Sequence, residues 1–308
     1  MSTTLVADHP TIRIAHLSDV HISAEPLGWR LGDYFNKRST GWINYRWLGR
    51  RHRFRRAGEA LAAIIRELVE RRPEHLIFTG DATALGFESE FARAAALLHV
   101  GDAAMPPGLA VPGNHDYYTR HAARSGLFEK YFAPWQAGER LDGATYPFAQ
   151  RVGHVWLIAV NSSTGNRWPL DAAGSVGSEQ LDRLRRLLAH LAPGPRILVT
   201  HYPVCRRTGR PENRWHCLRD AGDLIAAAQT GGICLWLHGH QHGAYHLFDN
   251  QLAPFPVINA GSATEHGRYT YNEYTIRGRH LHALRRTYAP HDGRFADGVF
   301  FEVELDAK

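Results

Sequence analysis

Cysteine is scarce in this chain of 308 residues, and its pattern excludes two structural classes. The three cysteines, Cys205, Cys217 and Cys234, include no C-x-x-C pair. An odd number without such a pair argues against both a disulfide framework and a zinc ribbon. We therefore expect three reduced thiols.

Long hydrophobic runs are also absent. The longest apolar stretches, such as residues 155–160 and 233–237, have the length of strands and fall far short of the ~20 residues that a membrane-spanning helix needs. Residues 1–10 show neither the apolar core nor the basic lead of a secretory signal. The sequence thus predicts a cytoplasmic protein without a membrane span, which leaves peripheral contact with the inner face of the membrane open.

Acidic residues are nearly missing from one segment, residues 29–56. It contains nine Lys or Arg residues and one acid, Asp33, so it carries +8 and the rest of the chain carries −2. A local basic block of this kind indicates a particular surface for a phosphate-rich or membrane partner.

Predicted strands and helices alternate along the chain. Strands are expected at residues 11–17, 75–79, 109–111, 155–160, 197–200 and 233–237. Helical patterns occur in the 57–68 region and at residues 88–99, 117–132, 178–188 and 220–229, and further short strands are expected beyond residue 256. This order favours an α/β layered fold, and without an internal repeat or linker we expect one domain over residues 1–308 with two packed sheets and an insertion at 29–56.

Polar clusters come directly after five of the predicted strands. They are Asp19-Val20-His21, Gly80-Asp81, Gly113-Asn114-His115-Asp116, His201 and Gly239-His240-Gln241-His242. Loops at the carboxyl ends of strands in a layered sheet converge on one crevice. In extended chain, residues i and i+2 face the same way, so Asp19 with His21, and His240 with His242, each present a matched pair.

These side chains have the chemistry of a divalent metal centre. Imidazole nitrogens and carboxylate oxygens without thiolates suit manganese, iron or zinc. Seven ligand-type side chains exceed what one four-coordinate ion uses, and a bridging carboxylate holds two ions roughly 3.5–4 Å apart. We therefore expect two divalent ions.

In the order of its motifs the sequence resembles the calcineurin-like metallophosphoesterase superfamily, whose signature is D-x-H, G-D, G-N-H-D/E, H and G-H-x-H. All five blocks are present between Asp19 and His242. The resemblance implies a four-layer α/β/β/α sandwich. It assigns one metal to Asp19, His21 and His242, the second to Asn114, His201 and His240, and the bridging role to Asp81.

The same resemblance gives two further residues a catalytic role. It implies that His115 contacts the phosphate or the leaving oxygen and that Asp116 orients His115. One departure concerns the position three residues after Asp81, where many members have Asp or Asn and this chain has Ala84. A side chain that would support the ligands is therefore absent there or supplied from elsewhere.

The segment at 29–56 mixes seven aromatic residues with its basic ones. Arg38, Trp42, Arg46, Trp47 and Arg50 are its candidates for substrate or membrane contact. Such a mixture suits an anionic membrane interface, but it also suits single-stranded nucleic acid or a helical cap whose aromatics pack on the domain.

The function expected from the sequence is two-metal hydrolysis of phosphate esters. A phosphodiester or pyrophosphate bond in a lipid-linked or nucleotide substrate is favoured, and the layout of the insertion resembles that of superfamily members acting on UDP-2,3-diacylglucosamine. A cyclic-nucleotide phosphodiesterase and a nuclease or nucleic-acid-binding protein are the alternatives, and the oligomeric state is left open.

Overall fold

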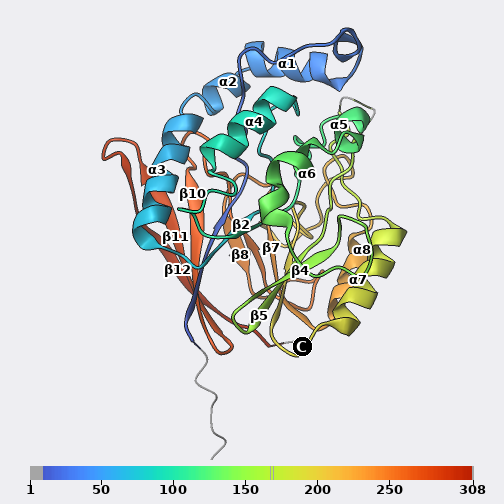
Figure 1. Cartoon of the computed structure of the whole chain (residues 1–308), viewed down its shortest axis with the longest axis vertical. Helices are drawn as coiled ribbons and strands as arrows, with labels where there is room; N and C mark the ends of the chain where they lie inside the picture. The colour runs from blue at the N-terminus through green and yellow to red at the C-terminus, as the bar shows by residue number, and fades with distance from the viewer. Residues whose placement is uncertain (1–9, 167, 169, 307–308) are drawn as a thin grey trace, which may run out of the picture.

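Two six-stranded sheets pack face to face between outer layers of helices in the computed structural model of this chain (Figure 1). The structure describes residues 10–166, 168 and 170–306. Helices α3 and α4 lie on one side of the sheets, and α7 and α8 lie on the opposite side. They span Ala57–Arg71, Glu88–Leu97, Ser178–His190 and Ala221–Thr230, respectively. This arrangement confirms the predicted α/β/β/α sandwich.

The first sheet holds the strands that precede the first three polar motifs. Its members are β1 (Ile12–Leu17), β2 (His75–Phe78), β3 (Gly108–Ala110), β10 (Thr270–Arg277), β11 (His280–Ala289) and β12 (Arg294–Glu304). Their order across the sheet is β12-β11-β10-β1-β2-β3. Strands β1, β2 and β3 are parallel, so the three loops after them leave the sheet at the same edge.

The second sheet holds the strands that precede the last two motifs. It consists of β4 (Phe148–Val152), β5 (Val155–Ala159), β6 (Arg196–Val199), β7 (Ile233–His238), β8 (Tyr245–Leu247) and β9 (Val257–Asn259). The order is β4-β5-β6-β7-β9-β8, with β5, β6, β7 and β9 parallel. All six strands expected before residue 240 lie within one residue of their predicted bounds.

Side chains on the two faces of each strand pack into different layers of the core. Ile14 and Ile77 point between the sheets, where they meet residues such as Leu157 and Leu237. Their neighbours Leu17 and Phe78 belong to a separate core under α3, α4 and α6 (Leu127–Phe132). On the second sheet, Trp156 and Trp236 pack beneath α7 and α8. Burial on both faces keeps the sheets rigid and fixes the position of the loops at their edge.

The predicted helix at residues 117–132 is wrong in its extent. The structure has a short helix α5 (Arg120–Arg124) and then α6, with Gly126 between them at φ +65°. Glycine adopts this left-handed conformation without steric penalty, so it ends the first helix and redirects the chain. Strands β4, β8 and β12 lie outside the predicted strands, because their mixed polar and apolar residues give a weak pattern.

The segment at 29–56 forms a 3₁₀ turn η1 (Leu31–Phe35) followed by helices α1 (Lys37–Trp47) and α2 (Arg50–Arg53). In Figure 1 these helices lie at the upper end of the molecule, beyond the outer helices. Trp29, Trp42 and Tyr45 pack against a small cluster around Leu85 and Phe87. A second 3₁₀ turn among the described residues, η2, spans Ala133–Gln136. Among the described residues, no helix combines the length and the apolar character needed to cross a bilayer.

Candidate metal centre

The seven predicted ligands converge at one edge of the two sheets. Asp19 and His21 follow β1, Asp81 follows β2, Asn114 follows β3, His201 follows β6, and His240 and His242 follow β7. The two sheets are tied together at this edge, where the His201 Nδ1 lies 2.7 Å from the carbonyl oxygen of Thr79. The structure thus brings residues of both sheets into one cluster.

The backbone of the cluster is strained in a way that aims its side chains inward. Asp19, His21, Asp81 and His240 have φ angles of 54°, 44°, 57° and 68°. Residues other than glycine adopt the left-handed region only at a cost, and such residues concentrate at functional sites. The β2 and β3 loops also meet closely, because a Cβ added to Gly113 would overlap the Asp81 carboxylate.

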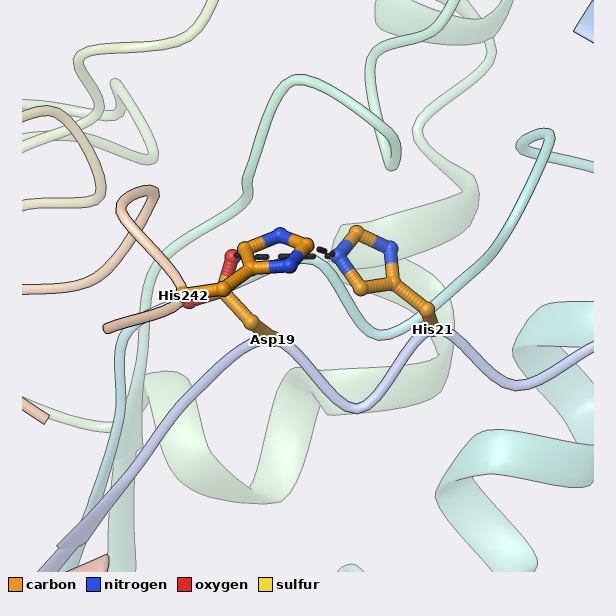
Figure 2. A group of neighbouring side chains, drawn as sticks. All are labelled: Asp19, His21 and His242. Carbon is orange, nitrogen blue, oxygen red and sulfur yellow. Dashed lines mark hydrogen bonds and ion pairs between the residues drawn. The ribbon is translucent and has the colours of Figure 1, made fainter. Parts of the chain in front are cut away.

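Figure 2 shows the first group, in which the rings of His21 and His242 turn toward each other beside Asp19. The His21 Nε2 lies 3.1 Å from the His242 Nε2. The Asp19 Oδ1 lies 3.7 Å from the former and 3.5 Å from the latter. Two imidazole nitrogens and a carboxylate oxygen aimed at a common point are a donor set for a divalent ion.

Asp81 lies between this group and a second one. Its Oδ2 is 3.5 Å from the His21 Nε2 and 3.6 Å from the His201 Nε2. The Asn114 Oδ1 lies 3.0 Å from the same nitrogen of His201 and 2.9 Å from the His240 Nδ1. Asp81 is therefore placed where one carboxylate reaches both groups, as the bridging prediction requires.

Electrostatics and burial both fit bound cations. The Asp19 Oδ1 is buried without a hydrogen-bond partner, although it faces the cluster. Burial, together with the nearby Asp19 and Asp116 carboxylates, raises the pKa of Asp81 well above its usual value. Burial also lowers the pKa of His201 and His240 and keeps these imidazoles neutral, the form that binds metal. The residues present therefore fit two divalent ions.

His115 lies beside the first group, but its orientation differs from the expectation. Its Nδ1 lies 2.7 Å from the carbonyl oxygen of Ala84. The main chain at Ala84 therefore orients the His115 ring, a role that was expected of the Asp116 side chain. Burial and the neighbouring Arg50 lower the pKa of His115 well below its usual value. His115 also forms a possible donor set with His21 and Asp81.

Asp116 does not orient His115, which corrects the prediction. Its carboxylate accepts hydrogen bonds from the backbone N–H groups of Ala82, Thr83 and Gly113 at 3.2, 3.0 and 2.9 Å. The residue is fully buried and joins the loop after β2 to the loop after β3. The role of Asp116 in this structure is to hold the turn at Asp81. The prediction failed because a sequence pattern cannot distinguish a contact to a ring from a contact to the backbone.

Glu265 is a residue of the site that the sequence reasoning missed. Its Oε2 makes a short contact with the His242 Nδ1, while its Oε1 accepts a 2.8 Å hydrogen bond from the Arg53 Nε. Burial alone would raise the pKa of Glu265, but the bonds from His242 and Arg53 outweigh it and lower the pKa to about 2. The signal was available, because Glu265 lies in the loop after the parallel strand β9.

The five candidate contact residues of the 29–56 segment separate into distinct environments. Arg38 is buried and donates to Asp33 at 2.7 Å and to the carbonyl oxygen of Leu85, so its prediction as a substrate or membrane contact is wrong. Trp42 is partly buried in the cluster around Phe87. Arg46 and Trp47 are exposed, and Arg50 points toward the metal ligands.

Comparisons with known proteins agree with this geometry. The family model of the calcineurin-like phosphoesterases matches residues 12–244. A comparison with curated proteins found none that matches the chain.

Solved structures share the fold at low sequence identity. A dimetal phosphatase from Danio rerio is similar with a TM-score of 0.67 at 12% identity, over 96% of this chain and 99% of that protein. The purple acid phosphatase PPD1 from yellow lupin (Lupinus luteus) gives a TM-score of 0.62 at 14% identity, over 97% of this chain and 54% of that protein. At such low identity, these similarities establish the fold alone.

Proposed function

Because the chain belongs to the calcineurin-like phosphoesterase family, we propose that it hydrolyses a phosphodiester or pyrophosphate bond with two divalent ions held at the edge of its sheets. One ion would be held by Asp19, His21 and His242. The second would be held by Asn114, His201 and His240, with Asp81 between the two. The observation that carries this assignment is the buried Asp19 Oδ1, which has no hydrogen-bond partner and lies within a cluster of imidazole and carboxylate groups.

The residues of the chain prepare the site for this chemistry. When bound, two divalent ions supply positive charge for the phosphoryl oxygens and lower the pKa of a water molecule. Asp81 spans both ion positions, and Glu265 fixes the ring of His242 through its Nδ1. Such a partner sets the tautomer of a ligand histidine and leaves its Nε2 free to bind. His115 lies beside these ligands, where it contacts the phosphate or the leaving oxygen.

A lipid-linked substrate is favoured over a free nucleotide by the surface next to the site. Leu31, Phe35, Trp47 and Leu48 of the η1–α1 region are 84%, 89%, 71% and 72% exposed. Several arginines accompany them, and apolar side chains among arginines are typical of proteins that bind anionic membranes. We call this set of four apolar side chains the apolar rim.

A second basic loop supports the same interpretation. Residues 206–214 contain four arginines and one acid, and the exposed Trp215 follows them. This loop is connected to the metal centre, because the Gln241 Nε2 donates to Glu212 at 2.9 Å. It also lies near α1, since the Lys37 Nζ donates to the carbonyl oxygen of Asp171 and the Ala172 N–H donates to the carbonyl oxygen of Trp215. Two basic segments with exposed tryptophans therefore lie next to the ligands.

A substrate panel tests the proposal. Purified protein loaded with manganese would be assayed against a nucleotide-linked lipid in mixed micelles, a generic soluble diester, a cyclic nucleotide and single-stranded DNA. The lipid should give the highest kcat/KM, because the rim adds binding to the acyl chains. Preference for the cyclic nucleotide or for DNA would replace the lipid assignment by one of those alternatives, and inactivity on the whole panel would contradict the proposal.

A further inference from the structure

Arg50 of helix α2 extends from the 29–56 segment into the metal centre. Its Nη2 lies 2.9 Å from the His115 Nε2 and 3.2 Å from the His21 Nδ1. We propose that Arg50 is a catalytic residue in phosphoester hydrolysis by this protein. Its guanidinium binds the phosphoryl oxygens of the substrate beside the two ions. The inference rests on the proposed function and adds a specific phosphate contact supplied by the segment.

The charge of Arg50 lacks a carboxylate partner, which distinguishes it from Arg38 and Arg286, two arginines that also enter the protein. Arg38 pairs with Asp33 at 2.7 Å, and Arg286 pairs with Glu67 at 2.9 Å. Within the part of the chain that the structure describes, Arg50 forms no ion pair within 4.0 Å, and the Asp81 and Glu265 carboxylates act on its guanidinium only from a greater distance. A partly buried cation that lies beside two imidazole rings and the Phe54 ring, without a carboxylate partner, is a site for an anion.

The hydrogen bonds of His115 show how Arg50 is oriented. The Nδ1 of His115 donates its proton to the carbonyl oxygen of Ala84, so its Nε2 accepts the hydrogen bond from Arg50. Among the hydrogen bonds that the structure describes, those of the guanidinium involve only Nη2, and the guanidinium carbon lies 5.9 Å from the centre of the Phe54 ring. The other N–H groups are available to phosphate oxygens, which arginine binds through two parallel hydrogen bonds.

Helix α2 is held firmly enough to present this side chain. Phe54, at its end, is buried and packs on the rings of His21 and His242 with centroid distances of 4.7 and 5.8 Å. Arg53 donates to Glu265, and its carbonyl oxygen accepts a 2.7 Å hydrogen bond from the His266 N–H. Arg50 is thus preorganised, and a preorganised cation near the reacting group favours the transition state.

Binding of inorganic phosphate tests this role without relying on turnover. The manganese-loaded protein, its Arg50→Ala and Arg50→Lys variants, and Arg51→Ala would be titrated with phosphate by calorimetry. Arg51 is the matched control, because it lies on the same helix and is exposed. Arg50→Ala should bind phosphate roughly 10–100-fold more weakly, as expected for hydrogen bonds to a charged group. Arg50→Lys should restore part of the affinity, because it keeps the charge but loses the paired geometry.

The outcomes distinguish a failure of this inference from a failure of the proposed function. Unchanged phosphate affinity in Arg50→Ala would overturn the role of Arg50 and leave the metal assignment intact. Loss of manganese from Arg50→Ala, measured by elemental analysis, would also overturn it, because Arg50 would then support the ligands. A wild-type protein that retains manganese but binds no phosphate would contradict both proposals.

Discussion

The metal centre is closed to solvent on most sides, whereas the adjacent 29–56 segment exposes much of its apolar surface. Asp19, Asp81 and His201 are at most 1% exposed, while Phe35 is 89% exposed. The centre is assembled from loops of both sheets, and the segment is continuous in sequence. The contrast teaches that the two regions are under different physical requirements. The centre needs exact placement of buried polar groups, whereas the segment leaves large apolar side chains exposed to solvent.

The two regions nevertheless touch at a few defined residues. Arg50 and Arg53 extend from α2 to His115 and Glu265, and Phe54 packs on His21. The inner face of the segment thus belongs to the centre, and its outer face does not. Variants on each side of this division should therefore affect different measurements.

The largest effect is expected for Asp81→Ala, which removes the carboxylate shared by both groups of ligands. Activity should fall by at least about 10³-fold, because the positive charge supplied by two ions contributes several kcal/mol to catalysis. Manganese content should fall below that of the wild-type protein. Asp223→Ala, which removes an exposed carboxylate, is the control and should change neither quantity. Full metal occupancy in Asp81→Ala would show that this residue does not bridge.

His115→Ala should separate turnover from metal retention. Turnover should fall by roughly 10²–10⁴, the range for losing a residue that assists the leaving group. The metal content should stay that of the wild type, because Asn114 is the proposed ligand from the same loop. Replacing the exposed His121 by alanine should have no effect. If His115→Ala loses manganese, the residue is a ligand, as its proximity to His21 and Asp81 also allows.

Glu265→Gln probes the connection between the two regions. The change removes the negative charge that holds the His242 ring, so manganese affinity should fall roughly 10–100-fold, as is usual when a residue behind a ligand is altered. Arg53→Ala should have a smaller effect in the same direction, since Arg53 is exposed and acts through Glu265. Glu70→Gln serves as an exposed control. Equal affinities for all of these proteins in a chelator competition would refute the link.

The smallest effect on turnover of a soluble substrate is expected from substitutions on the outer face of the 29–56 segment. Phe35→Ala combined with Trp47→Ala should weaken binding to anionic vesicles roughly tenfold, because each removes apolar surface that would enter the interface. Wild-type binding should weaken but persist at high salt, because arginines supply only part of it. Hydrolysis of a soluble diester should be unchanged.

The control for this pair lies elsewhere on the surface. Val299→Ala with Phe300→Ala also removes two exposed apolar side chains, but from β12. Vesicle binding should be retained in that variant. Binding to single-stranded DNA but not to vesicles would assign the segment to nucleic acid, and equal loss of lipid and soluble-diester turnover in the Phe35 and Trp47 variant would identify it as a structural cap.

Much of the fold could be read from local patterns. A strand buried on both faces must be apolar along its whole length, so runs such as residues 155–160 stand out, and the polar residues directly after them mark the sheet edge. The same rule, applied to the loop after β9, would have pointed to Glu265. The helix predicted across residues 117–132 failed because apolar spacing continues through Gly126, where the backbone turns.

The sequence by itself determined the α/β layered fold and the set of residues gathered at the sheet edge, because these depend on residue type, order and periodicity. The four-layer sandwich was implied by the resemblance of the motifs to a known family. Only the tertiary structure decided the partners of those residues. It showed that Asp116 holds backbone amides, that Ala84 orients His115 and that Arg38 is buried, whereas Arg50 reaches the centre. The physical reason is that a hydrogen bond or an ion pair forms between groups distant in the chain, and their distance is set by the packing of both sheets and not by any local pattern.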